Sequence, residues 1–196
     1  ISGFIARVQV TQTFQNPTSE KIEAVYVFPL PHEAAVDSMT MRIGERSIVG
    51  LIKRRDVARQ VYEEALAQGQ TAALLEQQRP NIFTQSVGNI EPGQEVKIEI
   101  SYVDVLKYDV GTYEFHFPMV VGPRFIPGGP VSSPPPTQPG LQGKVSPPVA
   151  DTTRVPDASR ISPPVLKPGY RNGHDISLSL KLDAGVPIQD LKAANH

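Results

Sequence analysis

The feature that most constrains this chain is a strict alternation of apolar and polar residues, which recurs in several short segments. The clearest example covers residues 95–102, where one valine, two isoleucines and a tyrosine alternate with polar residues. Successive side chains of a strand point to opposite faces of a sheet, so this period of two is typical of a half-buried strand. The same pattern occupies residues 4–15, 113–117 and 176–182. Such strands, separated by turn residues at short spacing, predict a mainly β protein built as an antiparallel β-sandwich.

Further strands are predicted between these segments. Residues 22–28 are apolar on both faces at their centre, which favours a strand inside the sandwich. Residues 39–43 and 48–52 form a predicted hairpin in which Gly44 supplies the turn. Residues 71–77 and 83–90 are also predicted as short strands, and the turn Glu91-Pro92-Gly93 leads into the strand that begins at residue 95.

One segment departs from the period of two. From Arg54 to Gln68 the apolar residues recur every three or four positions, as they do on one face of an α-helix. Asp56 is a suitable N-cap, and Gly69 is a suitable residue just beyond the C-terminus. We therefore predict one amphipathic helix packed on the sandwich. We expect its packing against the sheet to involve Tyr26, Phe28, Val57, Val61, Tyr62 and Ala65.

The proline content changes abruptly after the last of these strands. Residues 122–170 contain 13 of the 20 prolines and no periodic apolar pattern, which favours an extended connector with polyproline II character. We therefore divide the chain into a sandwich domain at 1–121, a proline-rich connector at 122–171 and an additional strand region at 172–196. The last region either completes the sandwich or starts a following domain. An apolar stretch begins again at Val186, so we expect the chain to be part of a longer protein.

The charge and residue content argue against several functional classes. Lys and Arg total 19 and Asp and Glu total 20, so the chain has no basic excess for nucleic acid and no expected nucleic-acid partner. There is no cysteine, so a cysteine-based site is excluded. No stretch approaches the 18 or more apolar residues of a membrane span, so we expect no membrane insertion. The four histidines, at 32, 116, 174 and 196, are not spaced as metal ligands. We therefore predict no catalytic residues, no cofactor and no metal site.

Two weaker motifs remain. The acidic pairs Glu63-Glu64 and Glu95 with Glu99 resemble the paired carboxylates of a glycosidase, but each also fits a solvated helix or strand face. Within the connector, Arg124, Pro127 and Pro130 fit the pattern of a basic residue followed by spaced prolines that aromatic grooves bind. We treat these three residues as a candidate interaction segment, although such matches arise easily in a proline-rich spacer.

A combination of short segments resembles a known family. The segments are Gln12-Thr-Phe-Gln-Asn-Pro17, Glu23-Ala-Val-Tyr-Val-Phe-Pro-Leu-Pro31, the helix with Ala58-Arg59-Gln-Val-Tyr62 and Ala65, Gly69-Gln-Thr-Ala-Ala-Leu-Leu-Glu76, Arg79-Pro-Asn81, Val87-Gly-Asn-Ile-Glu-Pro-Gly93 and Gly111-Thr-Tyr-Glu-Phe115. Together they resemble the VIT domain, the vault protein inter-alpha-trypsin domain, in a form similar to bacterial members. The resemblance covers about residues 1 to 121 in order.

The resemblance implies a non-catalytic β-sandwich-like domain that usually precedes a von Willebrand factor A domain. Such proteins include the heavy chains of inter-alpha-trypsin inhibitor and bacterial exported or cell-surface proteins, so an extracellular, periplasmic or cell-surface location is expected. The adhesion motif Asp-x-Ser-x-Ser is absent from this chain, so no metal is carried over.

We therefore expect a structural and protein-interaction module with protein partners. The alternative is a carbohydrate-binding or carbohydrate-cleaving sandwich. The strand at 176–182 also suggests homo-oligomers formed by strand exchange.

Overall fold

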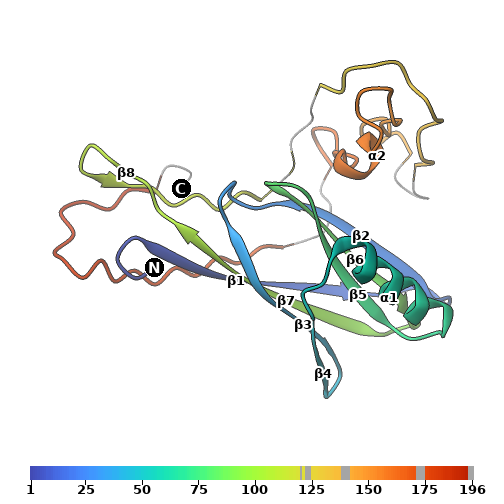
Figure 1. Ribbon diagram of the computed structural model, residues 1–196, viewed down its shortest axis with the longest axis horizontal. Coiled ribbons are helices and arrows are strands. Elements are labelled where there is room, and N and C mark those ends of the chain that lie inside the picture. The colour runs from blue at the N-terminus through green and yellow to red at the C-terminus, as the bar shows by residue number, and fades with distance from the viewer. Residues whose placement is uncertain (120, 122–124, 138–141, 171–174, 194–196) are drawn as a thin grey trace.

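The computed structural model describes residues 1–119, 121, 125–137, 142–170 and 175–193. Its regular elements are β1 (Ile5–Gln15), β2 (Ile22–Pro29), β3 (Ala35–Ile43), β4 (Arg46–Val49), α1 (Arg55–Ala67), β5 (Ala72–Arg79), β6 (Ile82–Ile90), β7 (Glu95–Val105), β8 (Tyr108–Asp109), β9 (Thr112–Tyr113) and α2 (Ala158–Ile161). The predicted mainly β class with one amphipathic helix on the sandwich is confirmed (Figure 1).

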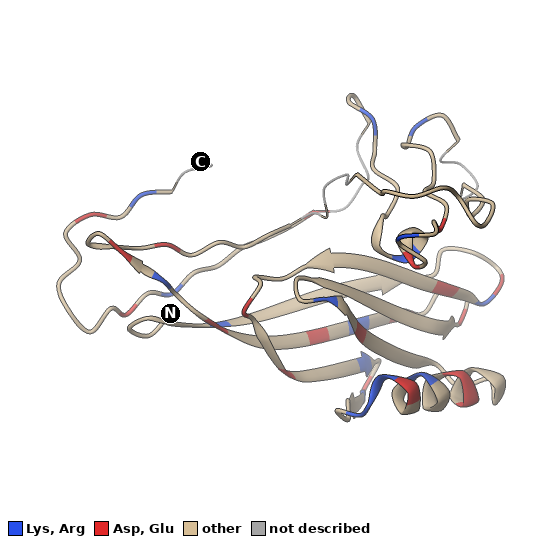
Figure 2. Ribbon diagram, turned by 45° about the horizontal axis from the view of Figure 1, so that its top comes forward, with Lys and Arg blue, Asp and Glu red and all other residues tan. Residues whose placement is uncertain are grey.

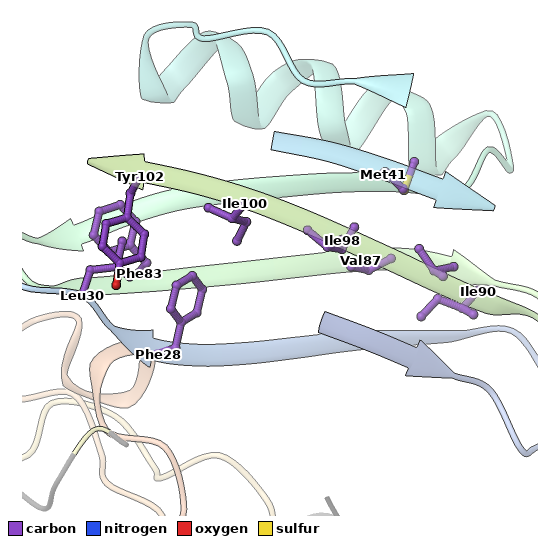
Figure 3. Close-up of a cluster of buried hydrophobic side chains, with 10 residues drawn as sticks. Phe28, Leu30, Met41, Phe83, Val87, Ile90, Ile98, Ile100 and Tyr102 are labelled. Carbon is purple, nitrogen blue, oxygen red and sulfur yellow. The ribbon is translucent and has the colours of Figure 1, made fainter. Parts of the chain in front are cut away.

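Two antiparallel sheets form the sandwich. One has the strand order β1-β7-β3-β4 and the other has the order β2-β6-β5. The core cluster lies between them because the alternating apolar residues of both sheets point inward. Figure 3 shows Ile98, Ile100 and Tyr102 from β7 facing Phe83 and Val87 from β6. The clearest alternating segment of the sequence has thus become a central strand of the first sheet.

The turns follow the predicted glycines. Gly44 has a φ of +53° in the two-residue turn between β3 and β4, and Gly93 has a φ of +70° in the turn between β6 and β7. Few residues other than glycine adopt this left-handed region without cost. Asn16, which is fully buried, ties the second turn to the first strand, because its main-chain N–H donates to the Gln94 carbonyl at 3.1 Å.

Several predicted strands differ in place or length. The second arm of the predicted hairpin, expected at 48–52, is β4 at Arg46–Val49. β2 is an edge strand rather than an inner one, and Val25 and Tyr26 at its centre are exposed. β6 takes the inner position, because β2 and β5 both pair with it. The predicted strand at 113–117 is reduced to Thr112–Tyr113 in β9, which pairs only with β8. None of the described strands pairs with the rest of this segment, so its alternating pattern does not become part of a sheet.

The proline-rich part is not extended throughout. Residues 125–137 and 142–170 contain the helix α2 and two antiparallel bridges, Pro130 with Thr152 and Val145 with Leu166. Val145, Ala158 and Ile161 are buried. Its compact form differs from the expected polyproline connector because the segment packs on the sandwich through ion pairs described below. The division of the chain at residues 121 and 171 stays a prediction.

The predicted strand at 176–182 is not formed. The segment instead runs past the N-terminus, where the Ile1 amino group donates to the Lys181 carbonyl at 2.6 Å and Gly3 donates to the Asp183 carbonyl at 2.8 Å (Figure 1). Only an isolated parallel bridge, Ser2 with Asp183, results. No described strand lies along residues 176–182, so Ile176 and Leu178 remain exposed.

Candidate interaction surface

Helix α1 covers the outer face of the three-stranded sheet. It packs mainly along β5, and its buried side chain Tyr62 reaches across to β2, where its hydroxyl donates to Glu23 at 2.8 Å. Burial and this hydrogen bond both raise the pKa of the Tyr62 hydroxyl above its ordinary value. Gly88 of β6 lies directly beneath, since an added Cβ there would be 2.5 Å from Leu66 and 2.8 Å from the Tyr62 hydroxyl. The side chains of α1 therefore pack directly on the backbone of β6 at Gly88.

The two ends of α1 are fixed differently. At the C-terminus, Gly69 has a φ of +76°, its N–H donates to Leu66 and that of Gln70 donates to Ala65. These two bonds form a Schellman motif, so the predicted role of Gly69 is confirmed. At the N-terminus the cap position is Arg54, without a side-chain cap bond, and Asp56 lies within the first turn. The predicted N-cap was wrong by two residues, and the Asp56 carboxylate instead faces the positive end of the helix dipole.

A buried carboxylate joins α1 to the sheet and to the proline-rich segment. The side chain of Glu76, on β5, is 4% exposed. Its Oε1 accepts from Arg59 of α1 at 2.5 Å, its Oε2 accepts from Arg160 of α2 at 3.0 Å, and Arg55 lies 3.9 Å away. A buried carboxylate is costly without such partners. We call these four residues the Glu76 cluster.

A second ion pair lies beside the Glu76 cluster. The two terminal guanidinium nitrogens of Arg79, at the end of β5, donate to the two carboxylate oxygens of Asp157, at 2.8 and 2.6 Å. This fork geometry is the strong form of an Arg–carboxylate contact. The hydrogen bond from Arg79 holds the pKa of Asp157 below its ordinary value, and the same bond raises the pKa of Arg79. Residues 157–160 are thus attached to the sandwich at two points.

The sequence did not single out Glu76, Arg79, Asp157 or Arg160. Their partners are 17 to 84 residues apart along the chain, so no local pattern joins them. One signal was available. Glu76 ends an otherwise apolar run, and Arg55 and Arg59 are four residues apart on one face of the predicted helix.

The structure places the predicted packing residues in two groups. Tyr62 and Phe28 are buried and Ala65 is half-buried, but Phe28 points into the core between the sheets and not toward the helix. Tyr26 stacks on Phe28 with ring centroids 5.6 Å apart. Val57 and Val61 are 40% and 48% exposed. The buried stripe of α1 is therefore narrower than the sequence suggests.

The candidate interaction segment lies only partly within the described residues. Arg124 lies outside the described residues. The Pro127 carbonyl accepts from the Thr152 hydroxyl at 2.7 Å, and Pro130 forms its bridge with the same residue. Both prolines thus contribute backbone contacts within the folded segment.

The acidic pairs of the sequence occupy solvated faces. Glu99 accepts two hydrogen bonds from Arg42, at 3.0 and 3.2 Å, and Glu95 forms an ion pair with Lys97 at 3.2 Å. Glu63 and Glu64 are exposed on α1, which carries residues of both charge signs along its length (Figure 2). Among the described residues, no group of three or more His, Cys, Asp or Glu side chains is placed to hold a metal ion. Within the same residues, no helix is long and apolar enough to cross a membrane.

Exposed apolar side chains gather where β4 leads into α1. All four residues of β4 are exposed, and Val49, Leu51 and Ile52 are 69%, 77% and 86% exposed. Figure 1 shows the β3–β4 hairpin projecting from the sandwich. Large apolar side chains that follow one another at the surface are typical of contact sites. We call residues 46–54 the β4 ridge.

The comparison with known families agrees with this architecture. Residues 1–102 match the family model of the vault protein inter-alpha-trypsin domain, VIT, and so cover more than half of the chain. The chain belongs to the VIT family. β1 to α1, β5 and β6, and most of β7 lie within the matched region, so the Tyr62 contact and Glu76 belong to the VIT domain itself. Asp157 and Arg160, which bind it, lie outside the match.

Several curated proteins share the VIT domain. Protein mono-ADP-ribosyltransferase PARP4 of Mus musculus is 42% identical over 123 residues, which are 63% of this chain and 6% of that protein. Von Willebrand factor A domain-containing protein 5A of Rattus norvegicus is 34% identical over 128 residues, 64% of this chain and 16% of that protein. Inter-alpha-trypsin inhibitor heavy chain H6 of Homo sapiens is 32% identical over 114 residues, 56% of this chain and 8% of that protein.

The matched region thus spans less than a fifth of each of these relatives. They share the VIT domain with this chain, and the functions of their other parts are not transferred to it. All three come from mammals, so the predicted similarity to bacterial VIT domains stays a prediction.

Proposed function

We propose that this VIT domain is a structural and protein-interaction module of a larger multidomain protein. Two kinds of relative support the proposal, since one is named for a von Willebrand factor A domain and another is an inter-alpha-trypsin inhibitor heavy chain. We further propose that a von Willebrand A-type domain follows it. The parent sequence beyond His196 tests this directly: an Asp-x-Ser-x-Ser motif is expected there, and a parent sequence without an A-type domain would contradict it.

The observation that carries the interaction role is the exposure of the β4 ridge. Val49, Leu51 and Ile52 lie close together in the sequence and expose apolar surface to solvent. None of them belongs to the core cluster. Leaving three such side chains in water forgoes about 1.5 to 3 kcal/mol each relative to full burial. A partner protein that covers them recovers part of that free energy.

Site-specific photo-crosslinking in the full-length protein tests the interaction role. A photoreactive residue in place of Leu51 is expected to form adducts with another protein or with another domain of the same chain, identified by mass spectrometry. The matched control carries the same residue at Thr11, an exposed position on the polar face of β1. Equal adduct yields at the two positions would refute the assignment of the surface.

We propose a non-catalytic role without cofactor or metal. One relative is named as a mono-ADP-ribosyltransferase, but the match covers 6% of it. Of the carboxylates suggested for carbohydrate cleavage, Glu99 is paired with Arg42 and Glu95 with Lys97. The nearly balanced charge of the chain, 19 basic against 20 acidic residues, supports the proposal that nucleic acid is not a partner.

The remaining proposals concern the surroundings of the module. An exported or cell-surface location is proposed from the heavy-chain relatives, and labelling of intact cells with a membrane-impermeant biotin reagent tests it. Strand exchange between copies is proposed for residues 176–182, where Ile176, Leu178 and Leu180 alternate and are exposed. If the mass in solution is that of a monomer both with and without residues 172–196, strand exchange is excluded.

A further inference from the structure

The outer edge of β4 has backbone groups available for pairing. β4 is the last strand of the order β1-β7-β3-β4, and no described strand pairs with its other side. The Gly50 N–H donates to the Met39 carbonyl at 2.8 Å, so these two residues are a hydrogen-bonded pair of the β3–β4 ladder. Bonded and non-bonded pairs alternate along an antiparallel ladder. Ser47 and Val49 therefore direct their N–H and C=O groups away from β3, toward solvent.

The chemistry of the β4 ridge restricts what can pair there. Residues 45–54 contain Arg46, Lys53 and Arg54 against one anion, Glu45, which gives a net charge of +2. Arg54 contacts Asp56 at 3.4 Å, while no ion pair of Arg46 or Lys53 is formed with any described residue. Cations thus lie at both ends of the apolar stretch that contains Val49 and Leu51.

A second copy of the chain fits this edge poorly. Two β4 strands paired edge to edge would bring two segments of charge +2 together, and like charges directly opposite destabilise a strand pair. The opposite edge of the same sheet offers no similar site, because the outward side chains of β1 include Gln9, Thr11 and Thr13. Charge complementarity instead favours an acidic strand on β4.

We propose that the β4 ridge binds an extended acidic segment of a partner protein, which adds to the sheet as a strand beside β4. Backbone groups of Ser47 and Val49 pair with the segment, alternate apolar side chains of the segment cover Val49 and Leu51, and its carboxylates face Arg46 and Lys53. Strand addition of this kind takes affinity from the main chain and selectivity from alternate side chains. The inference rests on the proposed interaction role and specifies its partner class.

Binding of model peptides to the 196-residue chain tests the proposal. The probe is a fluorescein-labelled peptide of about eight residues that alternates glutamate and valine, a normal strand length. Its fluorescence anisotropy should saturate with a Kd below about 1 mM at low salt, and binding should weaken as added salt screens the charges. A lysine–valine peptide and a glutamate–valine peptide with one central proline should each bind at least about tenfold more weakly.

Three variants locate the site. Leu51→Glu and Lys53→Glu should each weaken binding of the glutamate–valine peptide by about tenfold or more, and both positions are exposed, so the fold is not at risk. Thr11→Glu, on the opposite edge strand, should leave the affinity unchanged. Amide chemical-shift changes on peptide addition should centre on residues 46–53.

Several results would overturn the proposal. These are the absence of saturable binding, equal binding of the lysine–valine peptide, an equal loss in Thr11→Glu, or shift changes centred on α1 or β1. The crosslinking experiment separates this failure from that of the proposed function. Adducts at position 51 without peptide binding would retain the interaction role and reject the acidic strand, whereas the absence of both would reject both.

Discussion

A single methyl group at Gly88 should disturb the packing of α1 on the sheet. An alanine Cβ there would lie 2.5 Å from Leu66 Cδ2 and 2.8 Å from the Tyr62 hydroxyl oxygen, well inside normal contact distances of about 3.5 to 4.0 Å. The Tyr62 ring is held by its hydrogen bond to Glu23, so Leu66 has to move. Overpacking of this kind costs about 1 to 3 kcal/mol, of which reduced freedom of the unfolded chain offsets about 0.5 kcal/mol. We expect Gly88→Ala to lower the free energy of unfolding by about 1 to 2 kcal/mol.

Urea unfolding followed by circular dichroism measures this change, and a double-mutant cycle with Leu66 assigns it. Leu66→Ala alone should cost roughly 1 to 2 kcal/mol, because the side chain is half-buried. The loss of stability in the double variant should be about 1 kcal/mol smaller than the sum of the two single losses, because the alanine at 66 makes room for the new methyl group. Gly129→Ala is the control, because nothing lies within 4 Å of its added Cβ. Additive costs, or wild-type stability in Gly88→Ala, would refute the packing described here.

Three further changes probe other contacts of the domain. Tyr62→Phe should cost about 1 kcal/mol through the lost Glu23 bond and Tyr62→Ala about 2 to 4 kcal/mol, and equal losses in urea unfolding would show that the ring itself packs on nothing. Asn16→Ala should cost about 2 to 3 kcal/mol in the same assay, because its buried amide donates to Glu20 and Ile90; a loss below about 0.5 kcal/mol would contradict this. The pKa of Asp157 is lowered in the folded state, so its contribution is present above the unfolded value of about 3.9 and is lost as the pH falls through the folded value. Asp157→Asn should therefore lower stability by about 0.5 to 1 kcal/mol at neutral pH and by less at pH 3, and a pH-independent difference would count against the Arg79 pair.

The sequence was informative where one local rule decides the structure. The period of apolar residues and the position of Gly69 are enough to place α1 within one residue at each end. Alternation likewise located β7, because each inward position from Val96 to Tyr102 is apolar and no turn residue interrupts that run. In these segments propensity, periodicity and end signals agree, and a local pattern needs no knowledge of the partner.

The sequence was less informative where the partner matters. Residues 176–182 alternate as well as β7 does, yet no strand forms there because none of the described strands lies beside them. The outward exposure of Val57 and Val61 has a related cause, since α1 packs mainly along β5 and these two side chains lie outside that contact. A periodic pattern shows that a face is apolar, but the arrangement of neighbours decides whether that face is buried.

The Glu76 cluster bears on where this domain ends. Sequence composition places a boundary near residue 121, yet the Glu76 carboxylate, inside the VIT match, is bound by Arg59 of α1 and Arg160 of α2 together. If residues 157–160 were absent, one oxygen of this nearly buried carboxylate would lose its charged partner. Removing one partner of a buried ion pair is strongly destabilising, because the remaining charge stays buried without compensation. The Arg79–Asp157 fork adds a second attachment within the same short stretch. We therefore predict that the stable unit includes the segment around α2, which is connected to α1 through the buried side chain of Glu76.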